Sequence, residues 1–225
     1  MPELRLNLVT REWTIIATER AKRPEDFKKA AVKKEIPSFV DACPFCPGNE
    51  AKTPLETFSI KDKNGWRIRV TPNKFPALSC EVKRERINNG LKRLVTGVGI
   101  HEVIVETPLH NMTTALLPYQ DVVDIIKTYK NRFLEGYKDP RIDHIIIFKN
   151  HGEGAGTSLE HPHSQLISSP VIPIQIRDRL EAAVHFFDDT GKCLLCMTME
   201  MEKKEGTRIV LETDHFITFI PYAAL

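Results

Sequence analysis

Two histidines, His161 and His163, are separated by a single proline. They follow a glycine-rich segment, HGEGAGTSLE, at residues 151–160. An imidazole can bind a metal ion, and the neutral ring is a competent nucleophile at phosphorus near neutral pH. In an extended segment, residues i and i+2 point to one face, and Pro162 favours an extended conformation for the residue before it. The spacing therefore predicts that both imidazoles project together, either sharing a metal ion or dividing two tasks.

The glycine-rich segment has the features of an anion-binding loop. Glycines let backbone amides approach a phosphate closely, and neighbouring hydroxyls add donors. Gln165, two residues after His163, supplies an amide on the same face that can stabilise developing negative charge on phosphoryl oxygens. We predict a phosphate site facing a histidine nucleophile; the alternative is that the histidines only cap a turn. The loop residues concerned are Gly152, Gly154, Gly156, Thr157 and Ser158.

Four of the five cysteines form two CxxC pairs, Cys43/Cys46 and Cys193/Cys196, and Cys80 is left over. In a reducing compartment such pairs favour metal or redox chemistry over structural disulfides. A redox pair is expected at a helix start after a strand, whereas CPFCPG lies in a turn rich in proline and glycine. We predict a zinc knuckle at the first pair, with tetrahedral coordination by Cys and His. The alternative is a turn with two buried thiols.

The composition is that of a globular protein with one substantial core or two small ones. The chain has 225 residues, a formal net charge of +2 and 28% charged residues. This charge gives no reason to expect binding to nucleic acid or to a membrane. No apolar run is long enough to span a bilayer, and the N-terminus, MPELRLNLVTREW, alternates instead of carrying a signal-peptide core. The expected location is the cytoplasm.

The chain combines short strand-like segments with two helical ones. Apolar residues at helical spacing predict helices at about Tyr119–Tyr137 and about Pro173–Phe187. We expect an antiparallel sheet with helices, an α+β fold. Alternating or β-branched runs predict strands at Leu4–Leu8, Trp13–Ala17, Trp66–Val70, Glu102–Glu106, His144–Phe148 and Ser164–Ser169.

One order of features occurs twice in the chain. A CxxC pair, a charged stretch and an Arg-led β run appear as CPFC…WRIRVTPNKFPAL and again as CLLC…TRIVLETDHFITFIPYAAL. This indicates a duplicated unit whose second copy is incomplete. We expect a first catalytic domain at 1–170, a helical connection at 171–192 and the start of a second, truncated repeat at 193–225.

The segment HPHSQ, from His161 to Gln165, resembles the HPHxQ signature of galactose-1-phosphate uridylyltransferases, a branch of the histidine triad superfamily. Four further blocks resemble that family in the family's order, so the resemblance extends from the N-terminus to about residue 170. They are RAKRP at 20–24, CPFCPGNE at 43–50, RVTPNKFPAL at 69–78 and HEVIVETPLH at 101–110.

The resemblance implies a histidine-triad-like fold and a ping-pong nucleotidyltransferase. His163 matches the nucleophile that takes UMP from UDP-glucose as a covalent intermediate, which galactose 1-phosphate then attacks. Gln165 matches the residue that hydrogen-bonds the transferred phosphoryl group. A homodimer acting on a nucleotide sugar and a hexose 1-phosphate is also implied. The implied substrate-binding residues are Arg20, Arg23, Asn73, Asn150, Gly156, Thr157 and Ser158.

For His161 the resemblance implies a zinc ligand, with Cys43, Cys46 and His110 completing a Cys2His2 set. Four protein ligands leave no open position, so the zinc is expected to be structural and to fix the strand that carries His163. An acidic iron ligand of the family is expected near Arg179, which cannot ligate. We therefore expect no second iron site of that kind.

Departures from the family pattern leave other functions open. Ser164 stands where a glycine is common, a variation also seen in relatives that are ADP-glucose phosphorylases, and Thr157 stands where many members have cysteine. One alternative is a phosphorylase or hydrolase of ADP-sugars or dinucleoside polyphosphates that uses the same histidine. Another is a zinc-stabilised interaction module without turnover. His101 and His144, at strand starts, are expected to be structural.

Overall fold

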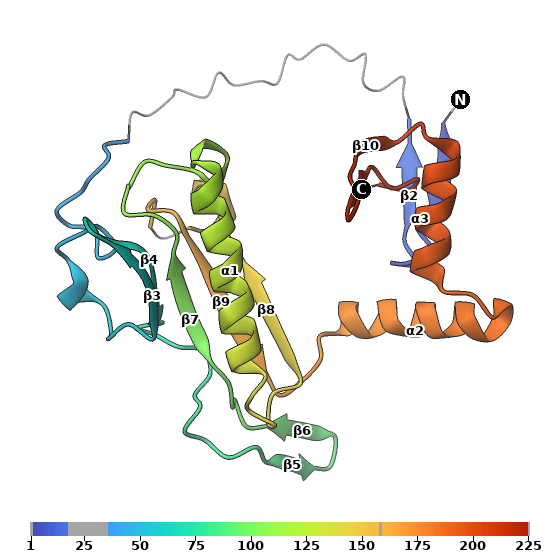
Figure 1. The fold of residues 1–225 in the computed structure, drawn as a ribbon. Helices are drawn as coiled ribbons and strands as arrows, with labels where there is room; N and C mark the ends of the chain where they lie inside the picture. Colours follow the sequence, from blue (N-terminus) through green and yellow to red (C-terminus); the bar gives the residue numbers. More distant parts are fainter. Residues whose placement is uncertain (1, 18–35, 158, 225) are drawn as a thin grey trace. The chain divides into compact units, whose positions relative to one another are not determined.

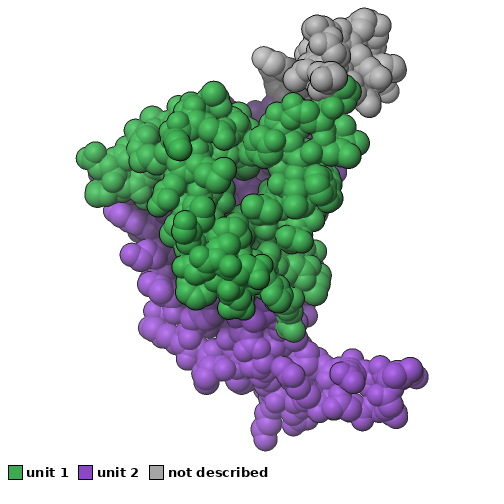
Figure 2. Space-filling view, turned by 90° about the vertical axis from the view of Figure 1, so that its right-hand side faces the viewer, with its two compact units in different colours: residues 1–32, 173–225 green, residues 33–172 purple. Residues whose placement is uncertain are grey.

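The computed structural model describes residues 2–17, 36–157 and 159–224. The chain divides into two compact units, which Figure 2 distinguishes by colour. One unit comprises residues 33–172, and the other comprises residues 1–32 with 173–225. Of the N-terminal segment, which we expected with the catalytic domain, the described residues 2–17 belong to the second of these units, and the expected domain boundaries stay a prediction.

A five-stranded antiparallel sheet forms the centre of the unit at 33–172 (Figure 1). The sequence predicted four of these strands, and their ends differ from the prediction by at most two residues. In sheet order the strands are β3 (Phe58–Asp62), β4 (Gly65–Pro72), β7 (His101–Val105), β9 (His163–Ser169) and β8 (His144–Phe148).

Helix α1 (Tyr119–Gly136) covers one face of the sheet (Figure 1). Ile125 is 1% exposed, and Val122 and Tyr129 pack beside it against the core. Ile126 and Phe133 also follow the helical spacing of apolar residues but are exposed, because the part of the helix surface that packs on the sheet is narrower than its apolar face. The buried core consists of Ile68, Val70, Ile104, Leu117, Ile125, Ile142, Ile145 and Leu166.

The opposite face of the sheet carries the chemistry-bearing residues. Val105 is paired with His163, and Val103 with Gln165, so these four side chains share one face. Val103 and Val105 belong to a second apolar cluster with Cys43, Phe45 and Cys46. The predicted knuckle therefore packs against the sheet face that bears His163.

Gly99 lies at a close approach between its own backbone and that of Ser168. Its amide donates to Ser79 O at 3.1 Å, and the next amide, of Ile100, donates to Ser168 Oγ at 2.7 Å. A Cβ at Gly99 would lie 2.2 Å from the backbone oxygen of Ser168 and 2.9 Å from Leu78 Cδ1. Only a residue without a side chain fits this contact.

We predict that Gly99→Ala lowers the free energy of unfolding by roughly 2 kcal/mol, because the backbone of β9 must move to relieve the overlap. Denaturant unfolding followed by circular dichroism measures the change. Gly154→Ala is the matched control, since its Cβ would meet nothing within 4 Å. Equal stability of the Gly99→Ala variant and wild type would contradict the close approach.

Several short elements were not predicted. β5 (Arg86–Asn89) and β6 (Lys92–Val95) form a hairpin, and short 3-10 turns lie at Glu50–Lys52, Thr114–Leu116 and Glu153–Ala155. The strands of the hairpin are charged and exposed, so they lack an apolar alternation. The dipeptide Asn89-Gly90, with φ of +59° at Gly90, is a hairpin signal that could have located them.

The other unit joins the two ends of the described chain. β1 (Glu3–Leu6) pairs with β2 (Trp13–Ile16); the sequence predicted both strands but not their pairing. The Tyr222 ring contacts the guanidinium groups of Arg5 at 4.4 Å and Arg208 at 5.3 Å. The remaining elements are α2 (Ile174–Thr190), α3 (Leu194–Glu205), β10 (Ile209–Glu212) and β11 (Ile217–Phe219).

Cys193 is the N-cap of α3, and its Sγ accepts a hydrogen bond from the Cys196 amide at 3.4 Å. The second CxxC pair therefore opens a helix, unlike the first. That residues 193–225 begin a second repeat stays a prediction. None of the helices in the described residues is long and apolar enough to cross a membrane.

Candidate functional site

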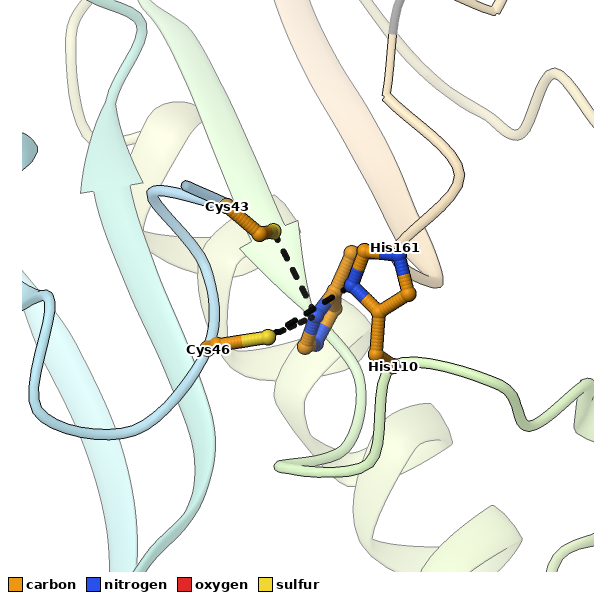
Figure 3. A group of neighbouring side chains, drawn as sticks. All are labelled: Cys43, Cys46, His110 and His161. Carbon is orange, nitrogen blue, oxygen red and sulfur yellow. Dashed lines mark hydrogen bonds between the residues drawn. The ribbon is translucent and has the colours of Figure 1, made fainter. Parts of the chain in front are cut away.

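Four potential metal ligands converge next to the start of β9, the strand that begins at His163. Cys46 Sγ lies 3.5 Å from His110 Nδ1 and 3.6 Å from His161 Nδ1, and Cys43 Sγ lies 3.8 Å from His161 Nδ1 (Figure 3). All four ligand atoms lie within 4.8 Å of one another, and all four residues are buried. Within the described part of the chain, they are the one such group of three or more residues found.

The geometry fits a tetrahedral ion. With metal–sulfur bonds of about 2.3 Å and metal–nitrogen bonds of about 2.0 Å, tetrahedral angles place S and N about 3.5 Å apart. The separations between sulfur and nitrogen that are given above, 3.5 to 3.8 Å, agree with this value. The residues present therefore fit a closed, four-coordinate site.

The knuckle is formed by local hydrogen bonds around the two cysteines. The Phe45 amide donates to Cys43 Sγ and the Val40 amide to Cys46 Sγ, each at 3.4 Å. Donors of this kind favour a thiolate, which burial opposes by raising the pKa of the Cys43 thiol. Gly48, at φ +87°, allows the chain to turn after Cys46.

His161 is held with one ring nitrogen turned toward the thiols. Its Nε2 lies 2.8 Å from the Thr107 carbonyl oxygen, so Nε2–H must donate and the Nδ1 lone pair faces Cys43 and Cys46. Burial lowers the pKa of His161 to about 4, so the ring is neutral at neutral pH. A neutral, oriented imidazole is the form that binds a metal ion.

His163 is held in the tautomer that a nucleophile requires. Its Nδ1 lies 2.8 Å from the His161 carbonyl oxygen, so Nδ1–H donates and Nε2 keeps its lone pair. Phe45 meets the His163 ring edge-on, with centroids 5.3 Å apart, and meets the His161 ring at 6.1 Å. Both imidazoles thus contact the same side chain, which fits the expectation that they project together.

Gln165 belongs to a polar cluster with His101 and Asn73. Its Oε1 lies 2.8 Å from His101 Nε2 and 3.5 Å from Asn73 Nδ2. The Ala77 amide donates to His101 Nδ1 at 3.1 Å, and the Phe75 amide donates to Asn73 Oδ1 at 2.9 Å. This cluster lies on the same sheet face as His163.

A cavity of about 690 Å³ opens between the metal ligands and the glycine loop. This is within the usual range for a small-molecule site. His163, Asn150 and Thr157 all line it, with Lys149 and His151 from the same region. Thr157 Oγ1 is buried and has no partner among the described residues, so it is a donor available to a ligand.

On the side of β9 opposite His163 lies a buried carboxylate. Glu106, 1% exposed, accepts from Tyr129 Oη at 2.8 Å and also from Ser164 Oγ and Lys149 Nζ. Burial, with the Glu106 charge, raises the pKa of Tyr129. Because Ser164 adjoins His163 in β9 and faces α1, this network anchors the strand from its other side.

The predicted substrate residues are only partly brought together. Asn73 contacts Gln165, whereas Asn150 and Thr157 line the cavity. Gly156, at φ +73°, lies in the loop between Gly152 and Thr157, both of which line the cavity. Arg20, Arg23 and Ser158 lie outside the described residues.

Sequence reasoning missed Phe45, Glu106 and the contact of His101 with Gln165. Phe45 lies inside the CPFC turn, so its proximity to the ligands was a usable signal. His101 was interpreted as structural, but its ring lies 2.8 Å from Gln165 Oε1. Only the pairing of β7 with β9, which places His101 opposite Ile167, reveals this contact.

Comparison with known proteins identifies relatives of the whole chain. The sequence model of the family described as "Galactose-1-phosphate uridyl transferase, N-terminal domain" matches residues 1–173. An ADP-glucose phosphorylase of Arabidopsis thaliana is 36% identical over 99% of this chain and 63% of its own length. A galactose-1-phosphate uridylyltransferase of Thermotoga maritima is 28% identical over 100% of this chain and 64% of its own.

Solved structures of the same two kinds of enzyme also match this chain. The crystal structure of the Arabidopsis thaliana ADP-glucose phosphorylase with bound ADP-glucose matches with a TM-score of 0.75 and 33% identity, over 100% of this chain and 65% of that one. A uridylyltransferase structure matches with a TM-score of 0.67 and 27% identity, over 100% and 62%. The chain spans less than two thirds of the length of these relatives.

Proposed function

Because the chain belongs to the galactose-1-phosphate uridylyltransferase family, we propose that it transfers a nucleotidyl group from a nucleotide sugar through a covalent intermediate on His163. The observation that carries this proposal is the hydrogen bond from His163 Nδ1–H to the His161 carbonyl at 2.8 Å. It leaves the Nε2 lone pair free in a ring that lines the cavity.

The proposed chemistry has two steps. His163 Nε2 attacks the α-phosphorus, an N–P bond forms, and the bond from phosphorus to the bridging oxygen breaks to release a sugar 1-phosphate. An oxygen of the acceptor then attacks the same phosphorus, and the N–P bond breaks. The Gln165 amide and the Thr157 hydroxyl are proposed donors to the phosphoryl oxygens. Asn73, Asn150, Gly156, Ser158, Arg20 and Arg23 remain proposed substrate-binding residues.

We propose ADP-glucose as the donor and inorganic phosphate as the acceptor, in preference to UDP-glucose and galactose 1-phosphate. The support is the 36% identity to an ADP-glucose phosphorylase, against 28% to the uridylyltransferase of Thermotoga maritima. Ser164 also supports it, as the residue that we noted in ADP-glucose phosphorylases. The products would then be glucose 1-phosphate and ADP.

The Cys2His2 cluster is proposed to hold a structural zinc ion. Two thiols and two imidazoles are a donor set that zinc prefers, and four protein ligands leave no position for substrate. The cluster adjoins His163: Phe45, between the two cysteines in sequence, meets the His163 ring with centroids 5.3 Å apart, and His161 lies two residues before His163. A homodimer in the cytoplasm also remains a proposal.

Incubation with ADP-glucose is expected to add one AMP to the chain at His163, with release of glucose 1-phosphate. Intact-mass spectrometry measures the adduct. Peptide mapping under acidic conditions is avoided, because the bond between phosphorus and the histidine nitrogen is acid-labile. A parallel incubation with UDP-glucose tests the base preference. Added phosphate should remove the AMP label as ADP, because it attacks the same phosphorus.

Faster labelling by UDP-glucose, with removal by galactose 1-phosphate and not by phosphate, would favour uridylyl transfer instead. Absence of any adduct with both donors would contradict the proposed function. It would favour the remaining candidate, a zinc-stabilised interaction module without turnover.

A further inference from the structure

We infer that His101 is a positioning residue that sets the orientation of the Gln165 side-chain amide; this inference rests on the proposed function. His101 opens β7 and lies on the same sheet face as Gln165. Its Nε2 lies 2.8 Å from Gln165 Oε1, the shortest contact of that amide oxygen. The identity of the hydrogen-bond donor in this contact decides which end of the amide faces a phosphoryl group.

The backbone fixes the tautomer of His101. The Ala77 amide lies 3.1 Å from His101 Nδ1 and can only donate, so Nδ1 must be the acceptor. A neutral imidazole that accepts at Nδ1 carries its proton at Nε2. His101 Nε2–H therefore donates to Gln165, and the partner atom must be the amide oxygen.

Asn73 supports the same orientation from a second side. The Phe75 amide donates to Asn73 Oδ1 at 2.9 Å, which turns the Asn73 nitrogen toward Gln165 Oε1 at 3.5 Å. Two donors thus converge on one oxygen. The 3.1 Å between Asn73 Nδ2 and His101 Nε2 is then the spacing of two donors that share an acceptor.

The consequence concerns the other end of the amide. Among the described residues, none accepts a hydrogen bond from Gln165 Nε2, so its two N–H groups remain for a ligand. If the amide were reversed, its oxygen would face the phosphoryl oxygens and repel them. A prearranged donor costs no reorganisation when charge develops, which is the condition for effective transition-state stabilisation. His101 thus acts on the reaction through Gln165 without touching substrate.

The first test is a rate of adduct formation. His101→Phe keeps a ring of similar size but removes the donor, and is expected to slow nucleotidylation of His163 roughly tenfold or more, a part of the roughly 100-fold or greater loss expected for Gln165→Ala. His101→Gln, whose Nε2 can replace the lost donor, should stay within about threefold of wild type. Substrate affinity should change much less than the rate, because the interaction is stronger in the transition state.

A double-mutant cycle separates this role from a purely structural one. In the Gln165→Ala background, His101→Phe should cause no further loss, since the residue through which it acts is gone. A full additional loss in that background would overturn the inference, as would an unchanged rate for His101→Phe alone. Equal melting temperatures of the variants show that they remain folded.

A second measurement needs no turnover. Long-range proton–nitrogen spectra of the wild-type chain report which His101 nitrogen carries the proton, and we expect Nε2–H. Protonation at Nδ1 would overturn the inference. A wild-type chain that no donor labels would contradict the proposed function, whereas the tautomer spectrum would still decide the arrangement of His101 and Gln165.

Discussion

Replacement of His163 by asparagine is expected to abolish nucleotidyl transfer, lowering kcat by roughly 10⁴-fold or more, because the covalent route loses its nucleophile. Asparagine is the sharpest choice, since its amide nitrogen can occupy the position of Nδ1 and keep the hydrogen bond to the His161 carbonyl. The atom removed is Nε2. The melting temperature should therefore change little while the adduct disappears.

The control is His144→Asn, the same substitution at the histidine that begins β8. His144 is paired with Ser169, at the end of β9 away from His163, and does not line the cavity. The rate of adduct formation in this variant should equal that of wild type. Retention of the nucleotidyl adduct in the His163→Asn variant would exclude His163 as the nucleophile.

Replacement of Cys46 by serine is expected to remove the proposed zinc and with it much of the stability of the unit at 33–172. Cys46 is fully buried, and its sulfur contacts both histidines of the cluster. Loss of outer-shell partners alone lowers metal affinity by about 10 to 100-fold, so loss of a ligand should exceed about 100-fold. By mass action this corresponds to roughly 3 kcal/mol of the free energy of unfolding at saturating metal.

Elemental analysis by mass spectrometry measures the metal content, and thermal unfolding with and without a chelator measures its contribution to stability. Cys80→Ser is the matched control, because Cys80 is an exposed free thiol outside the cluster. Wild type and this control should hold one zinc per chain, and the Cys46→Ser variant close to none. Equal zinc content in all three proteins would disprove the assignment of the ligands.

Much of the central sheet could be predicted from sequence because its strands are buried and apolar. Residues 102–106 and 144–148 contain short β-branched runs, Val-Ile-Val and Ile-Ile-Ile, because side chains of both strands pack in the apolar clusters, so the strands are visible in the sequence. The hairpin of β5 and β6 carries exposed, charged side chains and has no such pattern. Helix α3 was missed because its apolar residues do not form one stripe, and Leu195 and Met201 are exposed.

The parts of the candidate site that could be predicted from sequence are those formed by residues close together in the chain. CPFC and HPHSQ each specify residues that are close because they are neighbours in sequence. The partnership of His101 with Gln165 joins positions 64 residues apart and depends on the register of two strands, which no local pattern contains. The buried Glu106 network has the same origin, since it links β7, α1 and β9.

The four residues of the Cys2His2 cluster also constrain the order in which the chain can fold. The contacts of Cys46 with His110 and with His161 close loops of 64 and 115 residues, so they have high contact order. The ligand set is therefore complete only when both of these long loops have closed. The proposed zinc ion would therefore cross-link three segments that are distant in sequence, and its loss would free all three at once.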